Sequence, residues 1–449
     1  MKTTVGWVVF LASSLLVGCG SDSGSPPDAS GKRDTGSDGV ADAPPLADVA
    51  PGPDLPSLDV AVADLPIDSG GGGEVQRIID APAVDQPGLD TAATEGGGGA
   101  GEAGSSSTFV AALSGAQEVP AVATSALGSA TFTLSADRTQ LAYSVTHTVT
   151  GGTASHIHLA AAGENGAVIY PLAPFGSTMN GTVTITSADA DNLQQGKLYV
   201  NVHSTANPGG EIRGQILNAG DTLWVASLTG GQETPPVTST GSAHAAVIMD
   251  GAKANLRYHV TTTGLTLTNA HIHKAIAAIA GAVVYPLTPL GATIDGTVAI
   301  TSADAQDLVD GHFYVNVHTA ANPGGELRGQ LMMPGEILYS ASLSGANEVP
   351  AVTTSATGGA QFILDPSGAS LRYEAVFTGL TATASHIHTG ALGVNGAVLY
   401  PLTLTAAGAK GTQSVTPGDV TTLNAAGMYI NAHTSANPGG EIRGQISKQ

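Results

Sequence analysis

Three times, at intervals of 115 residues, the chain repeats one series of motifs. The phrase Asn-Pro-Gly-Gly-Glu-Ile-Arg-Gly-Gln at residues 207–215 returns at 322–330 with one substitution and at 437–445 unchanged. No insertion separates the copies, and a unit of this length can enclose a hydrophobic core of its own. The repeat therefore predicts three independent domains, at residues 108–218, 222–333 and 337–448.

Within each copy, apolar residues alternate with Ser and Thr, a pattern typical of strands with one buried face. In the first copy, residues 130–134 and 141–145 alternate around a polar turn and predict a hairpin. Residues 198–202 predict a later strand, a Pro-Gly-Gly turn leads into another at 211–217, and residues 187–195 predict one short helix. We therefore predict an all-β chain of three tandem Greek-key β-sandwich domains.

The composition excludes several classes of protein. A single cysteine rules out an intramolecular disulfide framework and every cysteine-rich metal module. The formal net charge of -21 argues against nucleic acid as a partner. The sequence also lacks a Gly-x-Ser-x-Gly elbow, a phosphate-binding loop and a recognisable carboxylate pair.

The first 19 residues predict an export signal with an anchor. Lys2 precedes an apolar run from Val5 to Leu16, which is too short to span a bilayer permanently. The run ends in Leu-Val-Gly-Cys at residues 16–19, which resembles the lipobox of bacterial lipoproteins. That resemblance implies lipidation of Cys19 and a cell-envelope location, as an outer-membrane lipoprotein that faces the periplasm or the cell surface. An ordinary secretory signal is the alternative.

The segment 20–107 is rich in Asp, Pro, Gly and Ala and almost lacks aromatic residues. Such a composition cannot bury a core, and its repelling carboxylates and stiff prolines keep a chain extended. We therefore predict a disordered tether between the membrane and the repeats. Regular aspartates also raise the alternative of a calcium-binding repeat, but no Asp-x-Asp-x-Asp loop with a closing Glu is present.

Nine of the thirteen histidines recur at equivalent positions of the copies. If residues 198, 200 and 202 face the core, His203 lies on the outer face of its strand, as His156 and His158 do on theirs. Three neutral imidazoles on neighbouring strands can chelate one ion, copper or another divalent metal. The predicted metal ligands are His156, His158 and His203 in the first copy, His271, His273 and His318 in the second, and His386, His388 and His433 in the third.

Polar surface residues copied passively by duplication are the alternative explanation of these histidines. The other four histidines are not repeated, and we expect them to be solvated surface groups: His147, His244, His259 and His312. We expect Arg213 to lie directly across from His203, at the mouth of the metal site, where it could steer an anion. A surface pair between Arg213 and Glu211 is equally compatible with the sequence. The equivalent arginines are Arg328 and Arg443.

The repeated units resemble CHRD domains, which occur in chordin and in bacterial secreted proteins. The resemblance rests on three motifs: Leu-Ser-Gly-Ala-Gln-Glu-Val-Pro at 113–120, Ser-His-Ile-His at 155–158, and Val-Asn-Val-His at 200–203 followed by residues 207–215. The second copy departs most, with Glu-Thr-Pro at 233–235.

A second, local resemblance is to copper-zinc superoxide dismutase, itself a Greek-key sandwich. His156-Ile157-His158 and the strand that ends at His203 are similar to its copper-binding strands. This likeness implies copper ligands at the nine histidines and an active-site role for Arg213, Arg328 and Arg443. However, no bridging histidine or zinc loop is visible between His158 and His203, and one cysteine cannot form the subunit disulfide.

Three functional hypotheses follow. The first is a lipid-anchored array of three CHRD domains, each with a three-histidine site for copper or a similar ion. The second is a metal-free adhesion or scaffolding array that binds an extracellular protein or glycan. A redox enzyme similar to superoxide dismutase is the third and least favoured.

Overall fold

The computed structural model describes residues 106–449, which contain all three copies of the repeat. Cys19, the predicted signal peptide and the predicted tether up to residue 105 lie outside the described residues and stay predictions. Between residues 106 and 449, no helix is long and apolar enough to cross a membrane.

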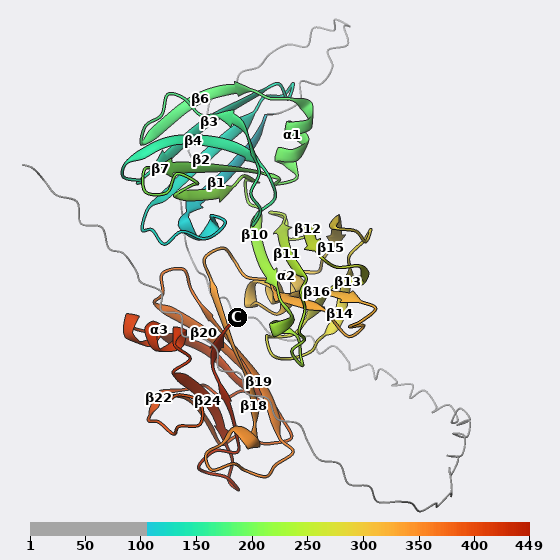
Figure 1. Ribbon diagram of the computed structural model, residues 1–449, viewed down its shortest axis with the longest axis vertical. Coiled ribbons are helices and arrows are strands. Elements are labelled where there is room, and N and C mark those ends of the chain that lie inside the picture. Colours follow the sequence, from blue (N-terminus) through green and yellow to red (C-terminus); the bar gives the residue numbers. More distant parts are fainter. Residues whose placement is uncertain (1–105) are drawn as a thin grey trace, which may run out of the picture. The chain divides into compact units, whose positions relative to one another are not determined.

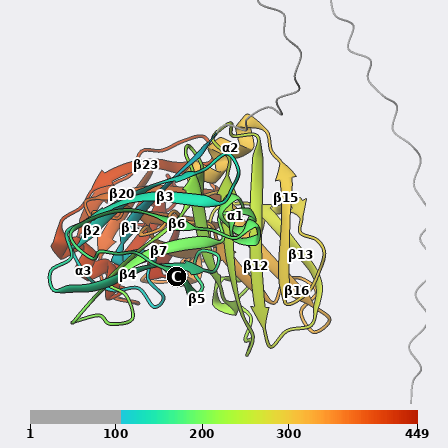
Figure 2. The same cartoon turned by 90° about the horizontal axis from the view of Figure 1, so that it is seen from above.

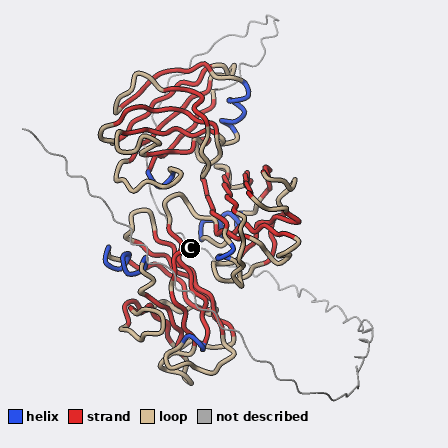
Figure 3. Tube along the Cα trace, viewed as in Figure 1, coloured by secondary structure: helices blue, strands red, loops and turns tan. Residues whose placement is uncertain are grey.

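Each copy is a sandwich of two antiparallel sheets, which confirms the predicted fold class (Figures 1 and 3). In the first copy the strands follow the orders β1-β2-β3-β6 and β5-β4-β7-β8, and one pair, Ser114 with Arg213, joins the two layers. The strands are β1 (Ser107–Ser114), β2 (Leu127–Leu134), β3 (Gln140–His147), β4 (Gly152–Leu159), β5 (Ala167–Pro171), β6 (Thr178–Thr184), β7 (Leu198–Ser204), β8 (Ile212–Gln215) and β9 (Leu217–Asn218).

The second copy has the same arrangement, as the sheets β10-β11-β12-β15 and β14-β13-β16-β17. β12 pairs with β15, and the two strands run side by side in Figures 1 and 2. The strands are β10 (Thr222–Leu228), β11 (Ser242–Met249), β12 (Asn255–Thr263), β13 (Leu267–Lys274), β14 (Ala282–Pro286), β15 (Thr293–Ala299), β16 (Phe313–Thr319) and β17 (Leu327–Gln330).

The third copy repeats the connectivity of the first, with one pair, Ser344 with Arg443, between its layers. Its strands are β18 (Ile337–Ser344), β19 (Thr357–Leu364), β20 (Ser370–Thr378), β21 (Ala384–Thr389), β22 (Val398–Pro401), β23 (Gly408–Ser414), β24 (Met428–His433), β25 (Ile442–Gln445) and β26 (Ser447–Lys448).

The alternating apolar residues form one core between the two sheets of each copy. In the first copy, Phe132 of β2, Leu141 of β3 and Val200 of β7 are fully buried together. The second and third copies have cores of the same kind. The predicted hairpin is β2 and β3, which pair along their full length.

One short helix follows the sixth strand of the first copy and its counterparts: α1 (Ser187–Gln194), α2 (Ser302–Asp310) and α3 (Pro417–Asn424). Thr186 caps α1 by accepting a hydrogen bond from the Asp189 backbone N–H at 3.1 Å. The Asp189 carboxylate also accepts a hydrogen bond from the hydroxyl of Tyr170 at 2.6 Å. The repeated Tyr-Pro-Leu motif therefore ties β5 to the helix.

The repeated Asn-Pro-Gly-Gly-Glu phrase forms the turn between β7 and β8. The Glu211 carboxylate accepts hydrogen bonds from Ser204, Asn207 and Thr124, at 2.6 to 2.7 Å. Gly210 has a φ of 142°, a value that L side chains rarely adopt. These contacts fix the turn next to the last residues of β7.

Candidate metal centre

In every copy, two histidines of one strand and one of its neighbour meet on the same side of the sheet. In the first copy β4 carries His156 and His158, and β7 carries His203. His156 lies opposite Asn201 in the ladder, and His203 lies opposite Ala154. The antiparallel pairing of β4 with β7 thus brings together residues that are 45 positions apart in the sequence.

The imidazole nitrogens lie close enough to share one ion. His156 Nδ1 is 3.1 Å from His203 Nε2, and the equivalent distances in the second and third copies are 3.1 and 3.0 Å. In each copy, one nitrogen from every ring of the triad lies within 4.8 Å of the other two. Ligands about 2.0–2.1 Å from a common ion are at most about 4.2 Å apart, so a bound ion requires a closure of less than about 1 Å.

Backbone carbonyls determine which nitrogen carries the proton in two rings of the first triad, those of His158 and His203. His158 Nδ1 lies 3.0 Å from the carbonyl oxygen of Gly166, and His203 Nδ1 lies 3.0 Å from that of Pro208. A carbonyl can only accept, so both Nδ1 atoms donate and both Nε2 atoms keep a lone pair. Metal-binding histidines in proteins are oriented by this kind of hydrogen bond.

One ligand nitrogen in each triad is buried without a hydrogen-bond partner. It is Nε2 of His158, His273 and His388. Buried polar atoms are normally paired, because an unpaired one loses its hydrogen bond to water without replacement. The same Nε2 atom is unpaired in all three copies, so each triad offers a nitrogen that could bind an ion.

Burial favours the neutral form of several histidines of the triads. Burial lowers the pKa of His156 and His158, and neighbouring imidazoles lower both further. Burial likewise lowers the pKa of His271, His273 and His318 in the second copy. Neutral imidazole is the form that binds metal, so these rings remain competent ligands to a lower pH than free histidine.

A stack of three side chains supports the second ligand of each triad. The His158 ring stacks on Tyr199 with ring centroids 4.7 Å apart, and the guanidinium carbon of Arg213 lies 3.4 Å from the Tyr199 ring centroid. The other copies repeat this stack, with Arg328 on Tyr314 and Arg443 on Tyr429. Each arginine therefore fixes the tyrosine that supports a ligand.

The expected position of Arg213 was wrong. Arg213 pairs with Asn201, two residues from the predicted partner His203, and only 1% of its surface is exposed. Its guanidinium donates to the carbonyl oxygens of Glu164 and Ala161, at 2.7 and 3.0 Å. A guanidinium that solvent does not reach cannot contact an incoming anion, and Arg213, Arg328 and Arg443 instead pack on the tyrosines beside the triads.

A buried glutamate lies next to the middle of β7 in the first copy and of the equivalent strands, β16 and β24, in the others. In the second copy, the Asn316 amide lies 3.4 Å from Glu233 and donates to it, and Gly325 leaves room for the carboxyl group. Burial raises the pKa of Glu118 and of Glu233 to about 7, against the attraction of the nearby arginines. Burial raises the pKa of Glu348 as well. These carboxyl groups hold their protons in mildly acidic solution.

The raised pKa makes stability depend on pH. Between the ordinary value of 4.5 and about 7, folded Glu118 keeps a proton that the unfolded chain releases, so stability falls as the pH rises through this window. Replacement of Glu118, Glu233 and Glu348 by Gln should remove this loss. Urea unfolding of residues 106–449 should show the variant more stable than the parent at pH 8, by about 1–2 kcal/mol in each of the first two domains, and similar at pH 5. If the parent and the variant lost the same stability between pH 5 and pH 8, the three glutamates would not be the cause of the pH dependence.

The model of the CHRD domain matches residues 109–216, 224–331 and 339–446, which is most of the chain. The chain belongs to the CHRD family. The three matches coincide with the three sandwiches, so each sandwich is one CHRD domain with its own histidine triad.

Two curated relatives are similar to part of the chain. Chordin of Danio rerio is 29% identical over 163 residues, which cover 32% of this chain and 17% of that protein. Chordin of Xenopus laevis is 31% identical over 173 residues, which cover 34% of this chain and 18% of that protein. The chain thus spans less than a fifth of the curated relatives' length. No solved structure matches it, and the resemblance to superoxide dismutase stays a prediction.

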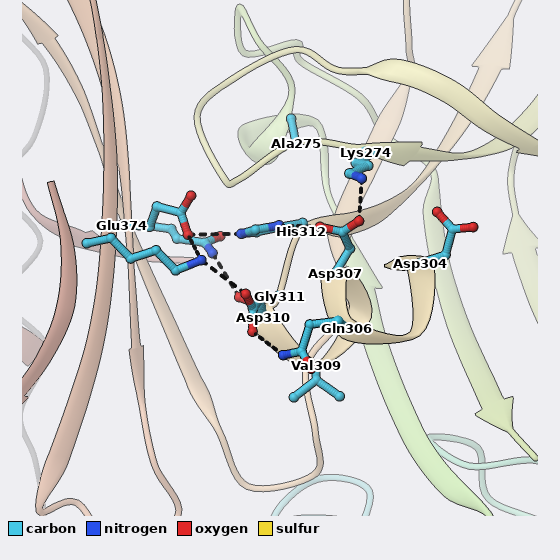
Figure 4. Close-up of polar contacts among 12 residues, drawn as sticks. Lys274, Ala275, Asp304, Gln306, Asp307, Val309, Asp310, Gly311, His312 and Glu374 are labelled. Carbon is cyan, nitrogen blue, oxygen red and sulfur yellow. Dashed lines mark hydrogen bonds and ion pairs between the residues drawn. The ribbon is translucent and has the colours of Figure 1, made fainter. Parts of the chain in front are cut away.

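The four unrepeated histidines of the CHRD domains are not the solvated surface groups that we expected. His147 is 9% exposed and bonds the carbonyl oxygen of Gly176. His312 lies between two carboxylates, 3.0 Å from Asp307 and 2.9 Å from Glu374 (Figure 4). The bond to Glu374 raises the pKa of His312. His244 and His259 have polar partners as well.

Three residues of the first CHRD domain that support the site were absent from the sequence-based predictions: Glu118, Tyr199 and Asn201. Tyr199 is 3% exposed and Asn201 is 2% exposed, although both lie on the strand face that turns away from the core. Their recurrence at Tyr314, Asn316, Tyr429 and Asn431 was the signal that could have indicated them.

Proposed function

We propose that each CHRD domain of this chain binds one copper ion, or a similar transition-metal ion, through its three histidines. In the first domain the ligands are His156 Nδ1, His158 Nε2 and His203 Nε2. The buried Nε2 atom of His158 carries the proposal, since the Nδ1 atom of the same ring donates to Gly166 and Nε2 has no hydrogen-bond partner. The second and third domains support the same assignment at their own triads.

The donor set limits the chemistry of the site. Neutral imidazoles suit copper, zinc, iron and nickel, whereas magnesium and calcium require oxygen ligands. Three protein ligands leave a coordination position for water or a small ligand, the arrangement of a site that can exchange what it binds. His156 and His203 are half-buried, which supports an open position on the solvent side of the ion.

The predicted anchor places this function at the cell envelope. Lipidation at Cys19 would hold the three domains at a membrane, and the acidic segment after it would act as the tether. An array of three equal sites in one chain suits the capture or storage of a metal more than a single catalytic event. Copper handling outside the cytoplasm is therefore the function that we propose.

Metal titration tests this proposal. Residues 106–449, purified without a chelating tag, should bind three copper ions, one per domain. Electron paramagnetic resonance of the Cu(II) form should show couplings to several nitrogen nuclei, because all protein ligands are imidazoles. Saturation below one ion per domain, or a spectrum with oxygen ligands alone, would contradict the proposal and would favour the metal-free adhesion array.

A further inference from the structure

We propose that the three-histidine sites select monovalent copper, Cu(I), because a buried guanidinium that forms no ion pair lies beside each of them. This inference rests on the proposed metal site and adds the charge state of its ion. It concerns Arg213 in the first domain, Arg328 in the second and Arg443 in the third.

The arginine charge is buried and forms no ion pair. The three side chains are 1 to 2% exposed. Arg213 donates to two backbone carbonyls and, at 3.3 Å, to the amide oxygen of Gln215, all of them neutral. Across residues 106–449, no ion pair within 4.0 Å includes Arg213, Arg328 or Arg443. Carboxyl groups attract the arginines only from beyond this distance: Glu118 and Glu164 for Arg213, Glu233 for Arg328 and Glu348 for Arg443.

The aromatic stack places this charge near the proposed ion. Arg213 packs 3.4 Å from the Tyr199 ring centroid, and the His158 ring follows 4.7 Å beyond it, inclined by only 10°. The guanidinium is therefore separated from a ligand ring by the thickness of one tyrosine. We take the guanidinium and the ion to be separated by on the order of 10 Å, with an effective dielectric constant near 20. Each added unit of charge on the ion then weakens its binding roughly tenfold or more.

The ligand set does not offset this repulsion. Each triad holds three neutral nitrogens and includes no carboxylate or thiolate among its ligand atoms. Cu(II) favours tetragonal sites with nitrogen and oxygen ligands, and three imidazoles leave such a set incomplete. Glu118 lies on the same side of β7 as the triad and holds its proton in mildly acidic solution. A monovalent ion therefore fits both the nearby arginine charge and the set of three ligands.

The reduction potential of bound copper tests the inference. We expect the parent chain to bind Cu(I) at least tenfold more tightly than Cu(II) in paired chelator competitions at pH 6, where Glu118 and Glu233 hold their protons. Replacement of Arg213, Arg328 and Arg443 by Met should lower the potential by about 59 mV, which equals a tenfold change for one electron. The matched variant with Lys at all three positions keeps the charge, and its potential should differ from that of the parent by less than half of that shift.

The outcomes separate this inference from the proposed function. Failure to bind copper in either oxidation state overturns the proposed function and the inference together. Tighter binding of Cu(II), or an unchanged potential in the Met variant, overturns the inference alone. If the arginine variants do not fold, Glu118→Gln, Glu233→Gln and Glu348→Gln together provide a second test at pH 8. They remove a negative charge and should raise the potential, and an absent or opposite shift overturns the inference.

Discussion

Replacement of His158, His273 and His388 by Ala should lower the copper affinity of the chain about a hundredfold or more. Each substitution removes one of three nitrogen ligands, and the two that remain cannot enclose an ion. The fold should persist, because the lost ring is polar and its Nε2 atom is unpaired. Isothermal titration or competition with a chromogenic chelator measures the loss directly.

The control for this variant comes from the chain itself. Position 147 corresponds to Thr262 in the second domain, so His147→Thr introduces a residue that the fold already accepts. It removes a histidine outside the triad and should leave three copper ions bound with parental affinity. Copper bound equally well by the His158 variant and the parent would show that the triads are not the ligands.

Arg213→Met should destabilise the first domain by about 3 kcal/mol. The substitution leaves the carbonyl oxygens of Ala161 and Glu164 without their donor inside the protein, and it breaks the cation–π contact with Tyr199. Relief of the buried charge offsets part of this cost, so the net effect is smaller than the sum of the lost contacts.

Native-state hydrogen exchange measures this effect within one molecule. Amides of β7 and β8 should exchange faster in the variant, by a factor of roughly one hundred, if they exchange through opening of the whole domain. The equivalent strands of the third domain, β24 and β25, serve as the internal reference and should not change. Equal exchange in the first and third domains would mean that Arg213 contributes nothing to stability.

Much of the fold could be predicted because it depends on local patterns. The alternation of apolar residues predicted the hairpin of β2 and β3, and the short helix appeared at the predicted place. The triad could be predicted for the same reason: two residues at i and i+2 share a strand face, and the repeat showed which third histidine belonged with them. The register of β7 with β8 could not be predicted in this way. In the structure Arg213 lies opposite Asn201, two residues from the expected partner His203.

The sequence alone thus determined the number of domains, their β-sandwich class and the residue types of the candidate ligands, since repeats and strand periodicity are visible in a linear chain. The tertiary structure decided what surrounds those ligands. The outward face of β7 reads as solvent-exposed in an alternating pattern, yet Tyr199 and Asn201 are buried there. Segments distant in sequence cover them: Asn165, in the loop between β4 and β5, donates to the carbonyl oxygen of Val119. Periodicity reports which residues share a face, whereas the burial of that face depends on how distant loops pack against it.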